Sequence, residues 1–306
     1  MLFRSAAGQT IAFNDALTVT TGMSAAAGAF NVALNQGGGA QTSTIAGSTT
    51  LANTGTLTLG NDAGDVANFT GGVSATSQTG AQAIRVYGAV HAAAGTVTLG
   101  DNDTPLRIAS SASFGGASAG LVTLASGGTV TIDDGFTLTL GNGVAAKPFT
   151  TGAVSGLGGG APSNLTINTA GAGTVAGTVG TDIGTVTVTQ SGGTTFQSTV
   201  DVQTLAITDT TAGQTVRVDG NLTLSTGMTV TGAGAYHVSV LGGANSIAGT
   251  TTFNNTGNLT VGSAGSTTSF ALGAVKTTAG VRTFAGTISS TRSEEHTSEL
   301  QSRQVI

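Results

Sequence analysis

Thr56-Leu57-Thr58-Leu59-Gly60-Asn61 is the stretch that decides the fold of this chain. Two close copies follow it, Thr96-Val97-Thr98-Leu99-Gly100-Asp101 and Thr137-Leu138-Thr139-Leu140-Gly141-Asn142. In each copy aliphatic residues alternate with threonine, and a glycine followed by Asn or Asp ends the alternation. A period of two predicts a β-strand with one apolar and one polar side. The glycine predicts a corner where the backbone needs a positive φ angle.

Looser copies of the hexapeptide continue along the chain at Asn164–Ile167, Thr185–Val188, Asn221–Leu224 and Asn258–Gly262. The three best copies begin 40 and 41 residues apart, and the later spacings are 21, 36 and 37 residues. Repeated strands without helical periodicity predict a β-solenoid, and we interpret the longer spacing as two turns of about 20 residues. The expected fold is a right-handed parallel β-helix of roughly 14 rungs, about 65 Å long.

The composition supports a β-rich chain and excludes several other classes. Among 306 residues there are 50 Gly, no Trp and no Cys, and only 8% of the residues are charged. Glycine has no three-residue period, which excludes collagen, and the abundant aliphatic residues disfavour disorder. The net charge of −5 is spread out, so neither nucleic acid nor an anionic membrane is an expected partner. Without cysteine, a disulfide scaffold and thiolate metal sites are excluded.

Two segments depart from the repeat. Residues 141–163 contain Lys147-Pro148-Phe149 and the glycine run 158–160, and we expect an irregular loop there within one solenoid domain spanning 1–291. Residues 292–306 hold every glutamate of the chain, Glu294, Glu295 and Glu299. Residues 292–302 resemble the translation of a common sequencing-library adapter. We therefore expect the natural sequence to stop near Thr291 and the tail to be non-native.

No residues are predicted to form a catalytic, cofactor-binding or metal site. Asp133-Asp134 is the one adjacent acidic pair within residues 1–291, but Gly135 follows it and favours a turn. His91 and His237 are far apart and have no His or Cys partner at metal-ligand spacing. Both are expected at the surface or at an edge.

Short acidic and glycine-rich stretches are also interpreted as turns. Asp101-Asn102-Asp103 and the pair Asp62 and Asp65 lack the pattern of a calcium loop and are expected to be solvated. The glycine runs 37–39 and 158–160 lack the Lys and Ser/Thr of a phosphate-binding loop. The chain is expected to be non-enzymatic and to need no cofactor.

The chain resembles the passenger regions of bacterial surface β-solenoids of the autotransporter and filamentous-haemagglutinin type. The resemblance covers about residues 10–288 and rests on the Thr-Leu-Thr-Leu-Gly-Asn rungs and on phrases such as Thr194–Val200 and Thr251–Val261. It implies export, surface display or secretion, and adhesion. Host-surface or matrix glycans and proteins would be the partners. Because the amino terminus does not resemble a signal peptide and no secretion domain is recognised, the chain is expected to be an internal fragment.

The expected function is a structural and adhesive rod segment of a bacterial surface-exposed or secreted protein. A carbohydrate-processing or carbohydrate-binding β-helix is the alternative. A groove lined with several carboxylates and basic residues from different rungs would support it, whereas a smooth Thr/Ser/Asn surface would support the structural rod. Ice binding is a further alternative, since Thr-x-Thr pairs could form a ladder. We expect these pairs to fall on alternate rungs, and they vary between Thr, Asn and Ser, which argues against a regular lattice.

Overall fold

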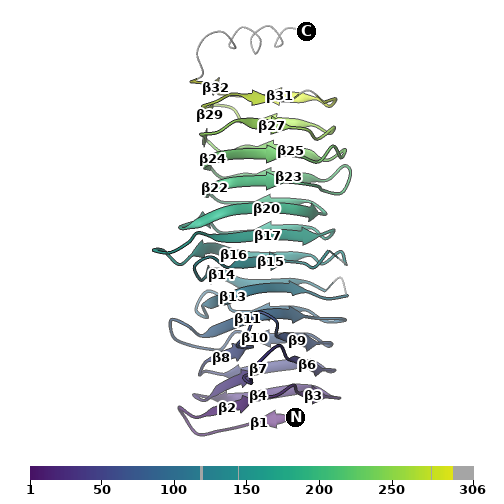
Figure 1. The fold of residues 1–306 in the computed structure, drawn as a ribbon, viewed down its shortest axis with the longest axis vertical. Coiled ribbons are helices and arrows are strands. Elements are labelled where there is room, and N and C mark those ends of the chain that lie inside the picture. The colour runs from purple at the N-terminus through teal and green to yellow at the C-terminus, as the bar shows by residue number, and fades with distance from the viewer. Residues whose placement is uncertain (118–119, 144, 277, 292–306) are drawn as a thin grey trace.

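The computed structural model describes residues 1–117, 120–143, 145–276 and 278–291, and these residues form an all-β structure without a helix. The chain coils through about 12 turns of about 23 residues. Figure 1 shows the turns stacked along one axis, from β1 (Leu2–Phe3) at one end to β32 (Thr287–Ser289) at the other. The predicted parallel β-solenoid is confirmed, but each turn is longer and the turns are fewer than expected. At about 4.8 Å per turn the rod is about 58 Å long.

Parallel pairing between successive turns builds three faces. Face 1 contains β1, β4 (Met23–Gly28), β7 (Thr49–Asn53), β10 (Val73–Ala75), β12 (Val97–Leu99), the first parts of β14 (Val122–Ile132) and β16 (Phe149–Gly156), β18 (Gly173–Val175), β21 (Thr194–Phe196), β23 (Thr215–Val218), β25 (His237–Val240), β28 (Leu259–Val261) and β31 (Arg282–Phe284).

Face 2 contains β2 (Thr10–Phe13), β5 (Asn31–Leu34), β8 (Leu57–Leu59), the first parts of β11 (Ile84–His91) and β13 (Leu106–Gly115), the second parts of β14 and β16, β19 (Val179–Gly180), the first parts of β22 (Val200–Ile207) and β24 (Leu222–Val230), β26 (Ala244–Ile247), β29 (Thr267–Phe270) and β32.

Face 3 contains β3 (Thr18–Val19), β6 (Thr42–Ile45), β9 (Val66–Phe69), the second parts of β11 and β13, β15 (Thr137–Leu140), β17 (Ser163–Thr169), β20 (Ile183–Ser191), the second parts of β22 and β24, β27 (Thr251–Phe253) and β30 (Ala274–Val275). No helix among the described residues is long and apolar enough to cross a membrane.

The three best copies of the hexapeptide lie on three different faces, which explains the wrong turn length. The first copy forms β8 on face 2, the second forms β12 on face 1, and the third forms β15 on face 3. A spacing of 40 residues therefore corresponds to one and two-thirds turns rather than two. The spacing from Asn164 to Thr185 is one full turn, because these two residues are register partners in β17 and β20.

The alternation within each strand builds one continuous core. Leu57 and Leu59 are completely buried, whereas Thr56 and Thr58 are half-buried and lie on the outer side, as predicted. Aliphatic residues from successive turns are in register, as Val97 is with Val122, so that apolar side chains stack along the axis. The buried residues of all turns form a single hydrophobic cluster. Burying each aliphatic side chain contributes on the order of 1.5–3 kcal/mol, and neighbouring turns depend on one another for that burial.

The corner glycines have the predicted backbone conformation. The φ angles of Gly60, Gly100, Gly141 and Gly262 are 81°, 73°, 89° and 82°. Asn35 takes the same corner position after β5 that Gly60 takes after β8, and its φ angle is 55°. The asparagine amide donates to the carbonyl oxygen of Val66 at 3.1 Å, so a polar side chain stabilises this corner where glycine is absent.

The strands confirm the prediction for residues 24–29 and correct the prediction for residues 141–163. The Ala-rich segment near residues 24–29 forms β4, a rung rather than a helix, as predicted. The stretch 141–163, expected to be an irregular loop, contains β16, which is in register with β14 and β18. The adapter-like tail, residues 292–306, lies outside the described residues.

Asp65 is buried at a corner, which corrects the expectation that it is a solvated turn residue. Asp65 is only 2% exposed to solvent. One carboxylate oxygen accepts the backbone N–H of Gln41 at 2.7 Å, and the other accepts those of Asn61 at 2.8 Å and Asp62 at 3.1 Å. The carboxylate thus joins the turn after β8 to the residue that precedes β6, one turn earlier.

We expect Asp65→Ala to lower the free energy of unfolding by about 2 kcal/mol, because it leaves three backbone donors without their acceptor. Asp62→Ala is the matched control, since the Asp62 carboxylate accepts one N–H, from Gly64, at the exposed tip of the same turn. That control should cost less than about 1 kcal/mol. Urea titration of both variants measures the difference, and equal losses would contradict the role given to Asp65.

Candidate functional site: a polar groove along face 3

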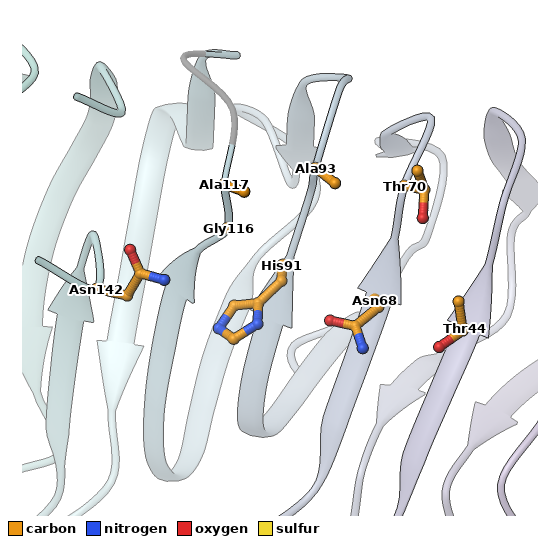
Figure 2. A pocket seen from close by; sticks show the side chains of 8 residues that line it. All are labelled: Thr44, Asn68, Thr70, His91, Ala93, Gly116, Ala117 and Asn142. Atoms are coloured by element: carbon orange, nitrogen blue, oxygen red, sulfur yellow. The ribbon is translucent and has the colours of Figure 1, made fainter. Parts of the chain in front are cut away.

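A row of polar side chains runs along the outer side of face 3. Thr44, Asn68, His91 and Gly115 are register partners in β6, β9, β11 and β13. In Figure 2 the side chains of Thr44, Asn68 and His91 follow one another along the stack. The register places one of them on each turn, because residues with the same parity in paired parallel strands point to the same side.

Two glycines, Gly115 and Gly116, lie on the turn between His91 and Asn142. A Cβ atom on Gly115 would lie 2.9 Å from the Cβ atom of Asn142, so the asparagine occupies the space that a side chain on Gly115 would take. Gly116 has a φ angle of 122°, and a side chain there would overlap the carbonyl oxygen of Ala92. At this turn, therefore, no side chain projects from Gly115 or Gly116 into the groove.

The second wall of the groove consists of small residues from the corner between faces 3 and 1. Thr70, Ala93 and Ala117 lie beside the polar row in Figure 2. Between the two walls lies an open groove with a volume of about 360 Å³. The residues that line it carry hydroxyl, amide, imidazole and methyl groups: Thr44, Asn68, Thr70, His91, Ala93, Gly116, Ala117 and Asn142.

A buried lysine lies behind the groove. Lys147 is 1% exposed, and its ammonium donates to the carbonyl oxygens of Ala92 at 3.3 Å and Gly120 at 3.2 Å. Burial lowers the pKa of Lys147. Burial of the half-buried imidazole, and next the positive charge of Lys147, lower the pKa of His91 below its ordinary value of 6.5. His91 is therefore neutral at neutral pH.

The lowered pKa of His91 makes stability depend on pH. As the pH falls, the unfolded chain binds a proton at His91 near pH 6.5, whereas the folded chain binds it at a lower pH. Stability contributed by the neutral imidazole is therefore present above pH 6.5 and decreases as the pH falls below that value.

We expect Lys147→Met to raise the pKa of His91, because the substitution removes the nearby positive charge while keeping an apolar chain of similar length. NMR titration of the imidazole measures the shift, and a thermal melt checks that the variant is folded. Lys276→Met is the control, because Lys276 contacts Asn255 and Thr278 near the other end of the rod. A His91 pKa that does not move in Lys147→Met would contradict the electrostatic coupling.

The histidines and the acidic pair do not converge. His237 begins β25 on face 1, where its Nδ1 atom accepts the backbone N–H of Asn258 at 2.8 Å, whereas His91 is on face 3. Asp133 and Asp134 lie in a turn in which Phe136 N–H donates to the carbonyl oxygen of Asp133 at 3.1 Å. The turn predicted from Gly135 is therefore present.

The remaining candidate stretches also form turns. The Asp101 carboxylate accepts the backbone N–H groups of Asp103 and Thr104, both at 3.0 Å. Gly39 and Gly159, in the two glycine runs, have φ angles of 77° and 111°. Within the described residues, no group of three His, Cys, Asp or Glu side chains is placed so that it could hold a metal ion.

An ion pair on face 2 was not anticipated from the sequence. Arg107 Nε lies 2.5 Å from Asp133 Oδ1, and Arg107 Nη2 donates to Asp133 Oδ2 at 2.9 Å. This bidentate hydrogen bond, opposed by partial burial, raises the pKa of Arg107. Arg85 is the register partner of Arg107 one turn earlier. Arg107 and Asp133 are 26 positions apart in the sequence, and their proximity can be inferred only once the length of the turn is known.

No known protein family, curated protein or solved structure matches this chain. Its class therefore rests on its own architecture, and that architecture is a parallel β-solenoid of about 12 turns.

Proposed function

We propose that this chain is a non-enzymatic structural and adhesive rod segment of a bacterial protein that is displayed at the cell surface or secreted. The observation that carries the proposal is the continuous parallel pairing of successive turns from β1 to β32. Such a stack keeps its two ends at a set distance, and each turn adds about 4.8 Å of reach. Adhesion would reside on its lateral faces and corner loops.

The outer row of face 1 supports a rod without a reaction centre. Its side chains come from one position in each turn, and all but Leu2 and Arg217 are small hydroxyl residues: Leu2, Ser24, Thr50, Ser74, Thr98, Thr123, Thr150, Thr174, Thr195, Arg217, Ser239, Thr260 and Thr283. Outward threonine suits a solvated strand. Serine and threonine without a neighbouring base are weak nucleophiles, so this row favours a scaffold over a catalyst.

The groove on face 3 favours binding over chemical processing of a carbohydrate. Glycoside hydrolysis ordinarily uses two carboxylic acids across the scissile bond. The residues lining the groove include neither Asp nor Glu. Its amide, hydroxyl and imidazole groups can instead form hydrogen bonds with a bound ligand.

Ice binding is a second candidate, because the observed register changes one argument against it. Thr137, Asn164, Thr185 and Thr204 lie on consecutive turns of face 3, and Thr139, Thr166 and Thr187 lie beside them. The expectation that the pairs alternate between turns was wrong. Gly227 follows Thr204 in the first row and Ala206 follows Thr187 in the second, so each row of hydroxyl and amide groups spans only a few turns. Thermal hysteresis in a solution of the purified protein would support ice binding, and its absence would exclude this function.

Removing one complete turn tests the rod. Because Thr150 and Thr174 are register partners, deletion of residues 150–173 joins Phe149 to Thr174 without changing the face of any later strand. We expect a folded rod shortened by about 4.8 Å in X-ray scattering. Deletion of residues 150–161 removes part of a turn and should prevent the stack from forming. Unfolding of both variants would contradict the role of turns as interchangeable spacers.

Labelling of intact bacteria tests display. An antibody raised against the rod should label unbroken cells of the source bacterium, or detect the protein in the medium. Detection only after the cells are broken would contradict display and secretion.

A further inference from the structure

We infer that the groove on face 3 binds a linear, hydroxyl-rich glycan that lies parallel to the rod axis, with one sugar unit opposite each turn. The inference deepens the proposed function and rests on it, since it assigns adhesion to a particular surface. The binding groups would be the side chains of Asn68 and His91, flanked by Thr44 and Asn142.

Four polar side chains of the groove are available to a ligand. Among the described residues, Thr44, Asn68, Thr70 and His91 make no side-chain hydrogen bond to the protein. Other outward asparagines serve the scaffold: Asn31 accepts the N–H of Thr56 at 2.8 Å, and Asn164 accepts that of Thr185 at 3.1 Å. Because Asn68 makes no such bond to the next turn, the structural role that asparagine has elsewhere in the rod does not account for it.

The spacing of the groups favours a glycan over an extended peptide. Successive turns are about 4.8 Å apart, so Thr44, Asn68 and His91 present one polar group per step of that length. This step is comparable to the advance of one pyranose unit in an extended chain. A peptide advances only about 3.3–3.6 Å per residue and would lose register with the row.

The charge near the groove indicates which class of glycan it would bind. Its lining residues carry no carboxylate, and the ammonium of Lys147 lies behind it, bonded to Ala92. A glycan bearing amines would be repelled by this charge, whereas a neutral or acidic glycan would not. Gly115 and Gly116 carry no side chain, so at the turn between His91 and Asn142 a bound sugar would lie against the backbone.

Calorimetric titration of the full chain tests the inference with three β-1,4-linked hexasaccharides: one neutral, one built of uronic acids and one bearing free amines. We expect the neutral or the acidic probe to bind and the amine-bearing probe not to bind. Asn68→Ala and His91→Ala should each raise Kd about tenfold, as loss of one well-placed hydrogen bond does. Ala93→Phe should block binding by filling the groove while leaving the polar row intact.

Thr98→Ala is the matched control, because Thr98 is also half-buried and outward-facing but lies on face 1. Its Kd should equal that of the unmodified chain, and thermal melts confirm that each variant is folded. If no probe binds, or if Thr98→Ala weakens binding as much as Asn68→Ala, the inference is overturned. The rod itself is judged separately, by the one-turn deletion and by labelling of intact cells.

Discussion

Replacing Gly141 by alanine is expected to lower the free energy of unfolding by about 4 kcal/mol, combining backbone strain of about 1–3 kcal/mol with overpacking of about 1–3 kcal/mol. The φ angle of Gly141 is 89°, which alanine adopts only with strain. An added Cβ atom would also overlap the carbonyl oxygen of Asn168 and lie 2.6 Å from the Cβ atom of Thr169. That carbonyl accepts the N–H of Gly143 at 2.8 Å, so it cannot move away freely.

Gly213→Ala is the matched control for this substitution. Gly213 has a similar φ angle of 76°, but no heavy atom lies within 4 Å of an added Cβ atom. We expect a loss of about 1–2 kcal/mol, from the backbone conformation alone. Chemical denaturation of both variants then separates backbone strain from the close approach of successive turns. Equal losses would show that the corner at Gly141 is not tightly stacked against the next turn.

Phe114→Ala is expected to cost about 3–5 kcal/mol, the range for removing a large aromatic side chain from a packed core. Phe114 is fully buried, and its register partners are Val90 in the preceding turn and Leu140 in the following turn. The cavity therefore removes contacts on both sides of its own turn. Because neighbouring turns stabilise one another, hydrogen-exchange protection should fall in all three turns.

Phe136→Ala is the comparison for Phe114→Ala. Phe136 is only partly buried where it packs against the core, and its loss should cost about 1–2 kcal/mol. The difference between the two variants, measured as a change in denaturation midpoint, reports how tightly the interior is filled. A loss below about 1 kcal/mol for Phe114→Ala would contradict a close-packed interior at this turn.

The fold class could be predicted because it depends on local chemistry. Leu57 and Leu59 alternate with Thr56 and Thr58, and only an extended strand places such residues on opposite sides. Gly60 then marks a corner, since a positive φ angle is costly for other residues. These preferences act within a few residues of one another, and they hold wherever the pattern occurs along the rod.

The turn length and the groove could not be predicted in the same way. The hexapeptide describes a strand and its corner but not the face it joins, so copies from three faces were interpreted as copies from one. The groove depends on that missing register: Thr44, Asn68 and His91 become neighbours only when the turn is about 23 residues long. Seen singly, His91 has no partner in the sequence that would mark it as part of a site.

The burial of charged residues was likewise decided by tertiary structure. Asp65 was expected in solvent, but backbone donors from two successive turns surround its carboxylate. Lys147 follows a glycine-rich stretch and lies inside the rod, where the carbonyl oxygens of Ala92 and Gly120 accept its hydrogen bonds. Both depend on atoms more than 20 residues away in the chain, which a local pattern does not specify.

By itself, the sequence determined that this protein is built of parallel turns with an aliphatic interior, hydroxyl-rich outer rows and glycine corners. These features follow from the preferences of single residues and their nearest neighbours. Tertiary structure alone decided how many residues make a turn, which side chains share a face and where a groove opens. The physical reason is that register partners on successive turns are 19 to 27 positions apart, and small differences in corner length set that separation.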